Sequence, residues 1–436
     1  MPGAQFVGNI PPMSRRPICT VILLTLLLTT ASCIPITGAL EEAPGNATVV
    51  WISIDGLRHD YIDRIHPPTL ERLKREGAFT NQEIPVFPSL TFPNHAAQVT
   101  GQRVDGTGVP ANLFYDPVVK QQFWLPDDQW VMRAEPIWVA AKREGVRSAV
   151  INWPMSHNQT GPYTSDYFGQ KYDMKETDEQ RLSRIVTLLN ADKAAPTLRL
   201  VMTYLSHVDV TGHSFGPDSP EVDQAVRAVD ASLGKFVTAV TTWFDATHSK
   251  DDELYILITT DHGMEAVRTP VNLDRLIGGA LTKGAKLVPS GSIATVHLLD
   301  LPPEDRDERA RQIVAKLKSN AFLQAWPSKE VPAKYHYSDL TRLGDVVVLL
   351  SPGYTFTTLR AGATQPTTTL KGNHGYDPAV SPNMLGSAVI WQYRRPLPKQ
   401  GDLGPIENTQ WAATVSELLR IAPPPKSDPH VVKGLR

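Results

Sequence analysis

The sequence is poor in cysteine. Its 436 residues include only Cys19 and Cys33, and both lie within the first 40 residues. The rest of the chain can therefore form no disulfide and offers no thiolate ligand to a metal. Extracellular animal enzymes of this size usually carry several disulfides, so the composition favours a bacterial setting, periplasmic or secreted.

A strong charge of one sign and a long apolar run are also missing. The formal net charge is −2 and no long basic run occurs, which argues against polymeric nucleic acid as a partner. The apolar stretch from Ile18 to Leu28 is shorter than the roughly 20 residues of a membrane span. Apolar residues make up 41% of the chain and charged residues 20%, which is enough for a substantial core.

The first 39 residues are predicted to be a secretory signal peptide. Arg15 and Arg16 precede the apolar stretch, and small residues follow it as far as Ser32. We expect cleavage after Ala39 and export to the periplasm or the medium. Two alternatives stay open: the segment remains as a membrane anchor, or Cys33, whose preceding residues weakly match a bacterial lipoprotein site, carries a lipid. Any membrane contact would depend on one of these anchors.

The remaining chain alternates between strand and helix patterns. Strands are expected near 48–54, 146–152, 198–205, 254–260, 345–350 and 387–391. Helices are expected at 69–76, 136–144, 179–190, 221–244, 304–319 and 409–420. This alternation predicts an α/β fold with a mainly parallel sheet covered on both faces. We assign residues 40–422 to one domain, with an insertion or cap region at about 265–371, and 423–436 to a frayed tail.

Three aspartates follow strand-like runs, and each has a histidine within four residues. The pairs are Asp55 with His59, Asp209 with His213, and Asp261 with His262. Ligands of open α/β sheets bind outside the carboxyl ends of the strands, so we expect these side chains at one edge. Each pair taken singly also fits a helix cap or a turn. Together they favour a metal site.

Thr91 lies just before an expected helix, in the segment 85–95. A threonine in that place is usually an N-cap. A helix N-terminus also favours an incoming phosphate, so Thr91 could instead be a nucleophile. A threonine hydroxyl needs a base or a metal to lower its pKa before it can attack.

A further candidate, His374, completes the first of two sets of three ligands. His374 lies in a loop flanked by glycines and joins Asp209 and His213. The second set is Asp55, Asp261 and His262, with the Thr91 oxygen as its fourth ligand; His59 is left over and is expected to be solvated. Two metals about 3.5–4 Å apart would hold both the attacking and the leaving oxygen of a displacement at phosphorus.

Five short motifs resemble the nucleotide pyrophosphatase/phosphodiesterase family of the alkaline phosphatase superfamily. They occur in the family's order and span about 45–395. The motifs are Ser53-Ile54-Asp55-Gly56, Leu90-Thr91-Phe92-Pro93-Asn94-His95, Asp209-Val210-Thr211-Gly212-His213, Thr260-Asp261-His262-Gly263-Met264 and Asn373-His374-Gly375-Tyr376-Asp377. Each is weak alone, and the series is specific.

The resemblance implies a three-layer α/β/α sandwich, two Zn²⁺ ions per chain and a nucleotidyl-threonine intermediate. Thr91 would attack phosphorus. The zinc at Asp55, Asp261 and His262 would lower the Thr91 pKa, and the zinc at Asp209, His213 and His374 would stabilise the leaving oxygen. Asn112 and the backbone N–H of Phe92 would bind the non-bridging oxygen. Asp and His ligands would accept Mn²⁺ as well.

Substrate preference is less well defined. The family analogy places Phe92 and Tyr172 on either side of a base, with Trp124 and Leu125 as further pocket residues, although core packing would also explain these side chains. The chain departs from many family members just before Asp209, where it reads Leu205-Ser206-His207-Val208. We expect His207 to face solvent.

The predicted activity is hydrolysis of nucleotide phosphodiester or pyrophosphate bonds to nucleoside 5′-monophosphates. The alternatives on the same core are a phosphomonoesterase, a phosphonate hydrolase, or a lysophospholipid or glycerophosphodiester hydrolase. No arginine close to Thr91 in the sequence could clamp a dianionic phosphoryl group. No Cys/Ser-x-Pro-x-Arg segment occurs, which argues against a sulfatase.

Overall fold

The computed structural model describes residues 46–338, 341–358 and 370–435. The expected signal peptide, residues 1–39, lies outside these ranges. Across the described helices, none is both long and apolar enough to cross a membrane.

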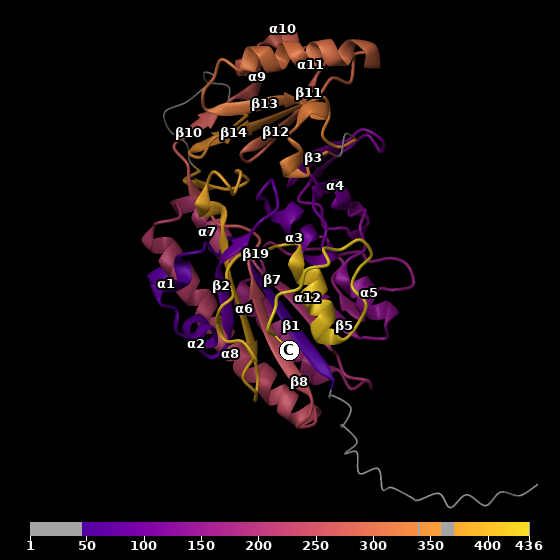
Figure 1. Ribbon diagram of the computed structural model, residues 1–436, viewed down its shortest axis with the longest axis vertical. Coiled ribbons are helices and arrows are strands. Elements are labelled where there is room, and N and C mark those ends of the chain that lie inside the picture. The colour runs from indigo at the N-terminus through magenta and orange to yellow at the C-terminus, as the bar shows by residue number, and fades with distance from the viewer. Residues whose placement is uncertain (1–45, 339–340, 359–369, 436) are drawn as a thin grey trace, which may run out of the picture. The chain divides into compact units, whose positions relative to one another are not determined.

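A central sheet of nine strands runs through the molecule (Figure 1). Its order is β18-β2-β17-β8-β1-β7-β5-β6, with β19 beside β2. From β8 to β6 every pair is parallel, whereas β17 is antiparallel to both neighbours. The prediction of an α/β fold with a mainly parallel sheet is confirmed. The strands are β1 (Ala47–Ile54), β2 (Ala78–Ile84), β5 (Ser148–Ile151), β6 (Tyr167–Phe168), β7 (Leu200–Leu205), β8 (Glu253–Thr259), β17 (Gly386–Gln392), β18 (Gly401–Asp402) and β19 (Ile406–Glu407).

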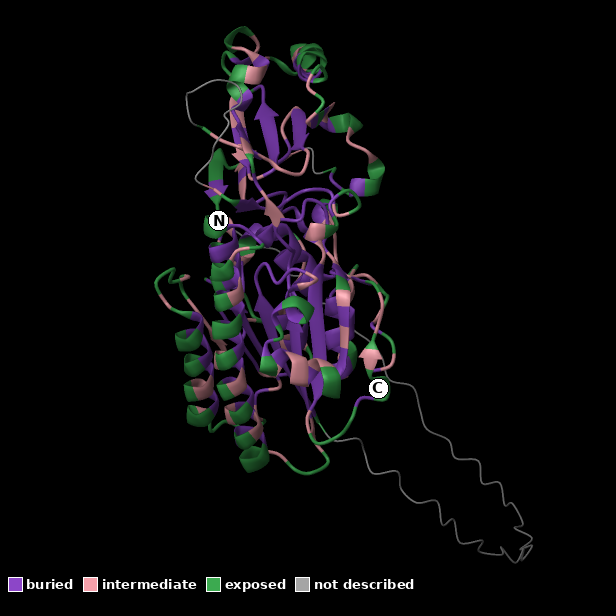
Figure 2. Ribbon diagram, turned by 90° about the vertical axis from the view of Figure 1, so that its left-hand side faces the viewer, coloured by how far each residue is buried: buried purple, intermediate pink, exposed green. Residues whose placement is uncertain are grey.

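Both faces of this sheet are covered by helices, because successive side chains of a strand point to opposite sides. On one side Val49 and Trp51 pack with α3 (Thr91–Thr100), α5 (Ile137–Arg143) and α12 (Gln410–Leu419). On the other side Val50 and Ile52 pack with α1 (Tyr61–Ile65), α2 (Pro68–Glu76), α6 (Asp178–Ala191) and α8 (Pro220–Thr247). The central strands are therefore buried throughout their length (Figure 2).

A second, antiparallel sheet forms within the region expected to be an insertion. Its order is β11-β12-β14-β13. The elements here are β11 (Lys286–Ser290), β12 (Ile293–His297), β13 (Leu323–Pro327), β14 (Val346–Leu350), α9 (Leu273–Ile277), α10 (Gly279–Thr282) and α11 (Pro303–Leu317). One side packs on α9 and α11, and the other carries Ile293 and Val347 against Phe87 and Leu90. The second sheet thereby supports the loop that leads into Thr91.

The remaining elements are short. They are α4 (Val104–Thr107), β3 (Leu113–Asp116), β4 (Gln121–Trp124), α7 (His207–Phe215), β9 (Glu265–Ala266), β10 (Thr269–Val271), β15 (Tyr354–Phe356), β16 (Gly372–Asn373) and the 3₁₀ turns Gln129–Val131, Ser328–Glu330, Ala333–Tyr335 and Pro382–Met384.

The interpretation of 423–436 as a frayed tail is wrong for its described residues, 423–435. Val432 and Leu435 are buried in the main core, on the side of α3 and α12. The backbone N–H of Asp428 donates to the carbonyl of Gly101 at 2.7 Å, and Thr409 donates to the Asp428 carboxylate at 2.7 Å. Two apolar side chains and these bonds hold the segment in place.

Candidate metal centre and nucleophile

The three aspartates lie at one edge of the central sheet. Strand β1 lies between β7 and β8 and is parallel to both, so the carboxyl ends of all three strands meet there. Asp55 follows β1, Asp261 follows β8, and Asp209 stands in α7, just after β7. Gly56 has φ +70°, and a Cβ atom there would lie 3.1 Å from the Cα of Asp209. Glycine is thus required for the strand ends to approach this closely.

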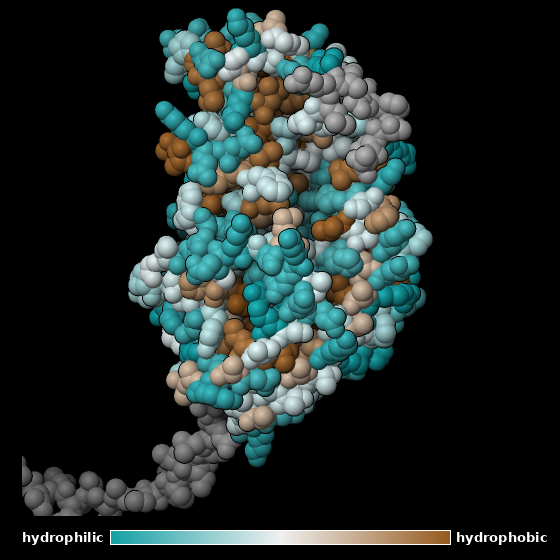
Figure 3. All heavy atoms as spheres, turned by 180° about the vertical axis from the view of Figure 1, so that it is seen from behind, coloured by the Kyte–Doolittle hydropathy of each residue, from teal (hydrophilic) through white to brown (hydrophobic). Residues whose placement is uncertain are grey.

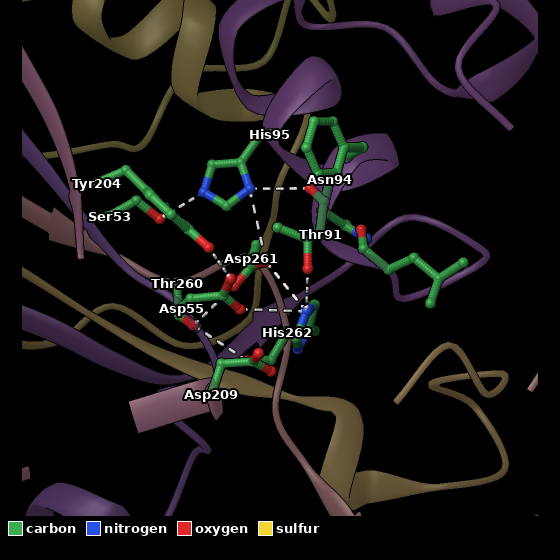
Figure 4. A network of polar contacts seen from close by, with 12 residues as sticks. Ser53, Asp55, Thr91, Asn94, His95, Tyr204, Asp209, Thr260, Asp261 and His262 are labelled. Carbon is green, nitrogen blue, oxygen red and sulfur yellow. Dashed lines mark hydrogen bonds and ion pairs between the residues drawn. The ribbon is translucent and has the colours of Figure 1, made fainter. Parts of the chain in front are cut away.

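The metal-ligand candidates form one cluster, in which His213 is half-buried and the others are buried. Figure 4 shows four of them, Asp55, Asp209, Asp261 and His262. His262 Nε2 lies 3.0 Å from Asp261 Oδ2 and 3.4 Å from Asp55 Oδ1. Asp209 Oδ1 lies 3.5 Å from His213 Nε2 and 3.6 Å from His374 Nε2. The structure therefore brings both expected ligand sets together. His262 also groups with Asp209 and His374, so it stands between the two sets.

All three histidines are oriented for metal binding. The Nδ1 atoms of His262, His374 and His213 lie 2.8, 3.0 and 2.8 Å from the carbonyl oxygens of Gly263, Ser89 and Gly372. Because a carbonyl only accepts, each Nδ1 carries the proton and each Nε2 turns a lone pair toward the carboxylates. This tautomer is the one that second-sphere carbonyls impose on metal-binding histidines.

One oxygen of each aspartate is buried without a hydrogen-bond donor. These are Asp55 Oδ1, Asp209 Oδ1 and Asp261 Oδ2. A buried carboxylate oxygen without a donor is costly unless a cation satisfies it. The donor set therefore fits divalent cations, and Asp55, Asp209, Asp261, His213, His262 and His374 are the residues that would hold them.

The cluster is electrostatically strained without a cation. Burial, together with repulsion from Asp209 and Asp261, raises the pKa of Asp55 well above its usual range. Burial also raises the pKa of Asp209. At Asp261 burial acts in the same direction, but His262 and His95 outweigh it and lower the pKa of the carboxyl. Burial and the neighbouring imidazoles lower the pKa of His374, which keeps this ring neutral and able to ligate.

Thr91 stands at the start of α3 with its hydroxyl toward this cluster. Thr91 Oγ1 lies 3.1 Å from His262 Nε2. The residue before the helix is Leu90, and no side chain caps this N-terminus, so the N-cap alternative for Thr91 is wrong. Asn94 fixes the loop that precedes α3. Its Oδ1 accepts from the Val86 N–H at 2.7 Å, and its Nδ2 donates to the Leu90 carbonyl at 2.9 Å.

Asn112 lies beside the nucleophile's helix. The backbone N–H of Phe92 donates to Asn112 Oδ1 at 2.9 Å. The two groups expected to bind the same substrate oxygen are therefore together, but in this structure they bond to each other. Phe92 is buried in the main core, in line with the packing alternative.

The remaining pocket candidates are less closely grouped. Tyr172 is half-buried; its hydroxyl accepts from buried Arg181, whose guanidinium lies 4.3 Å from the Tyr172 ring centre. The Leu125 N–H donates to the Asn112 carbonyl at 2.8 Å. Trp124 is 67% exposed and borders a 330 Å³ recess with Trp130 and Lys171. His207 is exposed, as expected.

Sequence reasoning missed several buried residues behind the cluster. The Tyr204 hydroxyl donates to Asp55 Oδ2. Glu83 Oε2 accepts the Thr260 N–H at 2.9 Å, next to Asp261. His95 contacts Ser53, Thr91 and Asp261. The only sequence signal was the place of His95 and Ser53 inside the quoted motifs.

Carboxylates and imidazoles at the carboxyl edge of an α/β sheet, with a hydroxyl at a helix start, define a metal-dependent hydrolase of phosphate esters. Residues 49–377 match the sequence model of the type I phosphodiesterase / nucleotide pyrophosphatase family. The chain belongs to this family, as the motifs predicted. Family membership indicates a nucleotide pyrophosphatase/phosphodiesterase that depends on metal ions.

Related sequences come from a yeast and from animals. An uncharacterized pyrophosphatase/phosphodiesterase of Schizosaccharomyces pombe is 29% identical, with coverage of 94% of this chain and 86% of the yeast protein. The bis(5′-adenosyl)-triphosphatase enpp4 of Mus musculus is 28% identical, with 82% and 76% covered. These relatives do not support the bacterial setting that the scarcity of cysteine suggested.

Solved structures share the fold. Murine ectonucleotide pyrophosphatase/phosphodiesterase 5 superposes with a TM-score of 0.73 at 24% identity, over 88% of this chain and 97% of the murine chain. An inactive variant of that protein, in which an alanine replaces a threonine, has been solved in complex with AMP and gives the same TM-score at 23% identity. The likeness confirms the alkaline-phosphatase-like α/β architecture.

Proposed function

We propose that the protein is an exported, two-zinc enzyme that hydrolyses nucleotide phosphodiester or pyrophosphate bonds to nucleoside 5′-monophosphates through a covalent intermediate on Thr91. The observation that carries this proposal is the hydroxyl of Thr91, 3.1 Å from His262 Nε2 at the edge of a buried cluster with three carboxylate oxygens that lack donors. The name of the mouse relative, a bis(5′-adenosyl)-triphosphatase, supports a nucleotide substrate.

In the proposed reaction, Thr91 Oγ1 attacks phosphorus, its bond to phosphorus forms, and the bond to the leaving group breaks. The hydroxyl proton passes to solvent, and water later cleaves the Oγ–phosphorus bond, which releases the monophosphate and restores Thr91. Asn112 and the Phe92 N–H would orient a non-bridging oxygen once the bond between them opens. Bound divalent cations would lower the pKa of the hydroxyl and neutralise the leaving oxygen.

The arginine nearest to Asp55 in the sequence does not offer its charge to a monoester dianion. Arg58 lies three residues after Asp55 and is buried, but its guanidinium contacts Asp60 and Asp218, each at 2.6 Å. It is therefore not available as a phosphate clamp.

Zinc is proposed from the family; Mn²⁺ would fit the same oxygen and nitrogen ligands.

The first test compares two chromogenic substrates. With metal present, kcat/KM for a nitrophenyl ester of thymidine monophosphate should exceed that for nitrophenyl phosphate, because the guanidinium of Arg58 is already paired with Asp60 and Asp218 and does not meet the extra negative charge of the monoester. A chelator should abolish both activities, and added Zn²⁺ or Mn²⁺ should restore them. A preference for the monoester would instead support the phosphomonoesterase alternative.

We further propose that Phe92 and Tyr172 hold the base, with Leu125 and Trp124 beside them. Stacking of one base on an aromatic ring contributes about 1–3 kcal/mol, so Tyr172→Ala should raise KM for the thymidine ester by about 5- to 150-fold. Hydrolysis of bis-nitrophenyl phosphate, which has no base, should stay unchanged. Equal losses on both substrates would show that Tyr172 acts through the fold.

A further inference from the structure

The imidazole of His95 joins three parts of the site although it is fully buried. Its Nε2 lies 2.8 Å from Ser53 Oγ, on the strand that ends at Asp55. Its Nδ1 lies 2.8 Å from the carbonyl oxygen of Thr91 and 3.5 Å from Asp261 Oδ2. Figure 4 shows the ring between these groups, on the far side of the carboxylates from His262.

The contacts of His95 define a single state of the ring. The Thr91 carbonyl only accepts, so Nδ1 carries the proton and donates, and Nε2 accepts from the Ser53 hydroxyl. The rings of Trp153 and Tyr204 pack edge-on against the imidazole, with centroids 5.2 and 5.1 Å away. Hydrogen bonds at both nitrogens and rings on both flanks prevent the imidazole from turning.

We infer that His95 is a positioning residue that fixes the backbone of Thr91 relative to the Asp261 carboxylate. The inference rests on the proposed role of Thr91. His95 stands one helical turn after Thr91, so its Nδ1 binds the residue that carries the nucleophile while the same proton faces the metal-directed oxygen of Asp261. Since the His95 side chain is fully buried, it does not contact substrate.

Removal of the Nδ1 donor should weaken both metal binding and the chemical step. Loss of a partner behind a metal ligand typically lowers metal affinity by about 10- to 100-fold. A displacement of about 1 Å between reacting groups can lower the rate by about 100-fold. Substrate binding depends on other residues, so KM should change little.

The experiment compares His95→Gln, His95→Asn and His297→Asn in the full chain. The asparagine amide can donate near the Nδ1 position, whereas the longer glutamine amide reaches the Nε2 position and keeps only the contact to Ser53. His297 is an equally buried histidine, 3.1 Å from Thr295 Oγ1 in β12, and serves as the control. We would measure Zn²⁺ affinity without substrate, by competition with a chromogenic chelator, and then kcat, KM and Tm at saturating Zn²⁺.

We expect His95→Gln to bind Zn²⁺ about 10- to 100-fold more weakly and to lose about 100-fold in kcat at unchanged KM. His95→Asn should keep most of the Zn²⁺ affinity and kcat of the parent protein, and His297→Asn should change neither quantity. Equal losses in the Gln and Asn variants, or unchanged Zn²⁺ affinity and kcat in His95→Gln, would overturn the inference. If Thr91→Ala stays active while His95→Gln still weakens Zn²⁺ binding, the role of Thr91 fails and the link from His95 to Asp261 stands.

Discussion

Thr91→Ala is expected to lower kcat on the thymidine ester by at least about 10⁴-fold, because it removes the only atom proposed to attack phosphorus. The fold should survive. The Thr91 side chain does not cap α3, and the approach to the helix is held by Asn94 and by packing of Phe87 and Leu90 under the second sheet. The measurement is nitrophenol release at saturating metal, with Tm recorded alongside.

Two further observations make this result specific to the nucleophile. Zn²⁺ affinity of the alanine variant should stay close to that of the parent protein, because the six carboxylate and imidazole ligands remain. Thr91→Ser keeps a hydroxyl in nearly the same place and should retain part of the activity. Turnover near the parent rate in Thr91→Ala would mean that water attacks phosphorus directly, and the covalent step would have to be abandoned.

The strand-end aspartates could be predicted from the sequence because their signal is local. Asp55 and Asp261 each follow a mostly apolar strand, and parallel packing brings such strand ends together whatever the intervening chain does. The buried face of α8 is also predicted by a local pattern, because Val222, Val226 and Val229 recur at helical spacing and are buried.

The residues behind the ligands could not be predicted, because their partners are distant in the sequence. His95 bonds to Ser53 across 42 positions, and Glu83 bonds to Thr260 across 177. Each looks like an ordinary polar residue until the chain is folded. Strand β2 was missed for a related reason: Ala78–Ile84 has a mixed polar sequence and becomes a strand by pairing with β17 and the short strands β18 and β19.

Asp55→Asn should stabilise the metal-free protein at neutral pH. Burial and the charges of Asp209 and Asp261 raise the pKa of Asp55 well above its usual range. A carboxyl whose pKa is raised by folding contributes stability that is fully present below the pKa of the unfolded chain and is lost as pH rises through the folded pKa. Neutral pH lies above the pKa of the unfolded carboxyl, so this contribution is reduced in the parent protein, whereas the neutral amide avoids the loss and its oxygen can still accept from Tyr204.

With metal present, the same substitution should have the opposite effect. A ligand that binds only the folded state at 100 times its Kd stabilises that state by about 2.7 kcal/mol. Asp55→Asn removes an anionic ligand, so this gain should shrink, and turnover should fall with it.

Calorimetry in EDTA and in Zn²⁺, at pH values from 5 to 8, would separate the two effects: the advantage of the variant in EDTA should diminish toward low pH. If the variant melts below the parent protein in EDTA at neutral pH, repulsion among the three carboxylates is not what the metal relieves. If Asp55→Asn has a higher Tm than the parent protein in EDTA and a lower Tm in Zn²⁺, the carboxylates weaken the metal-free fold because they are placed to bind the cation.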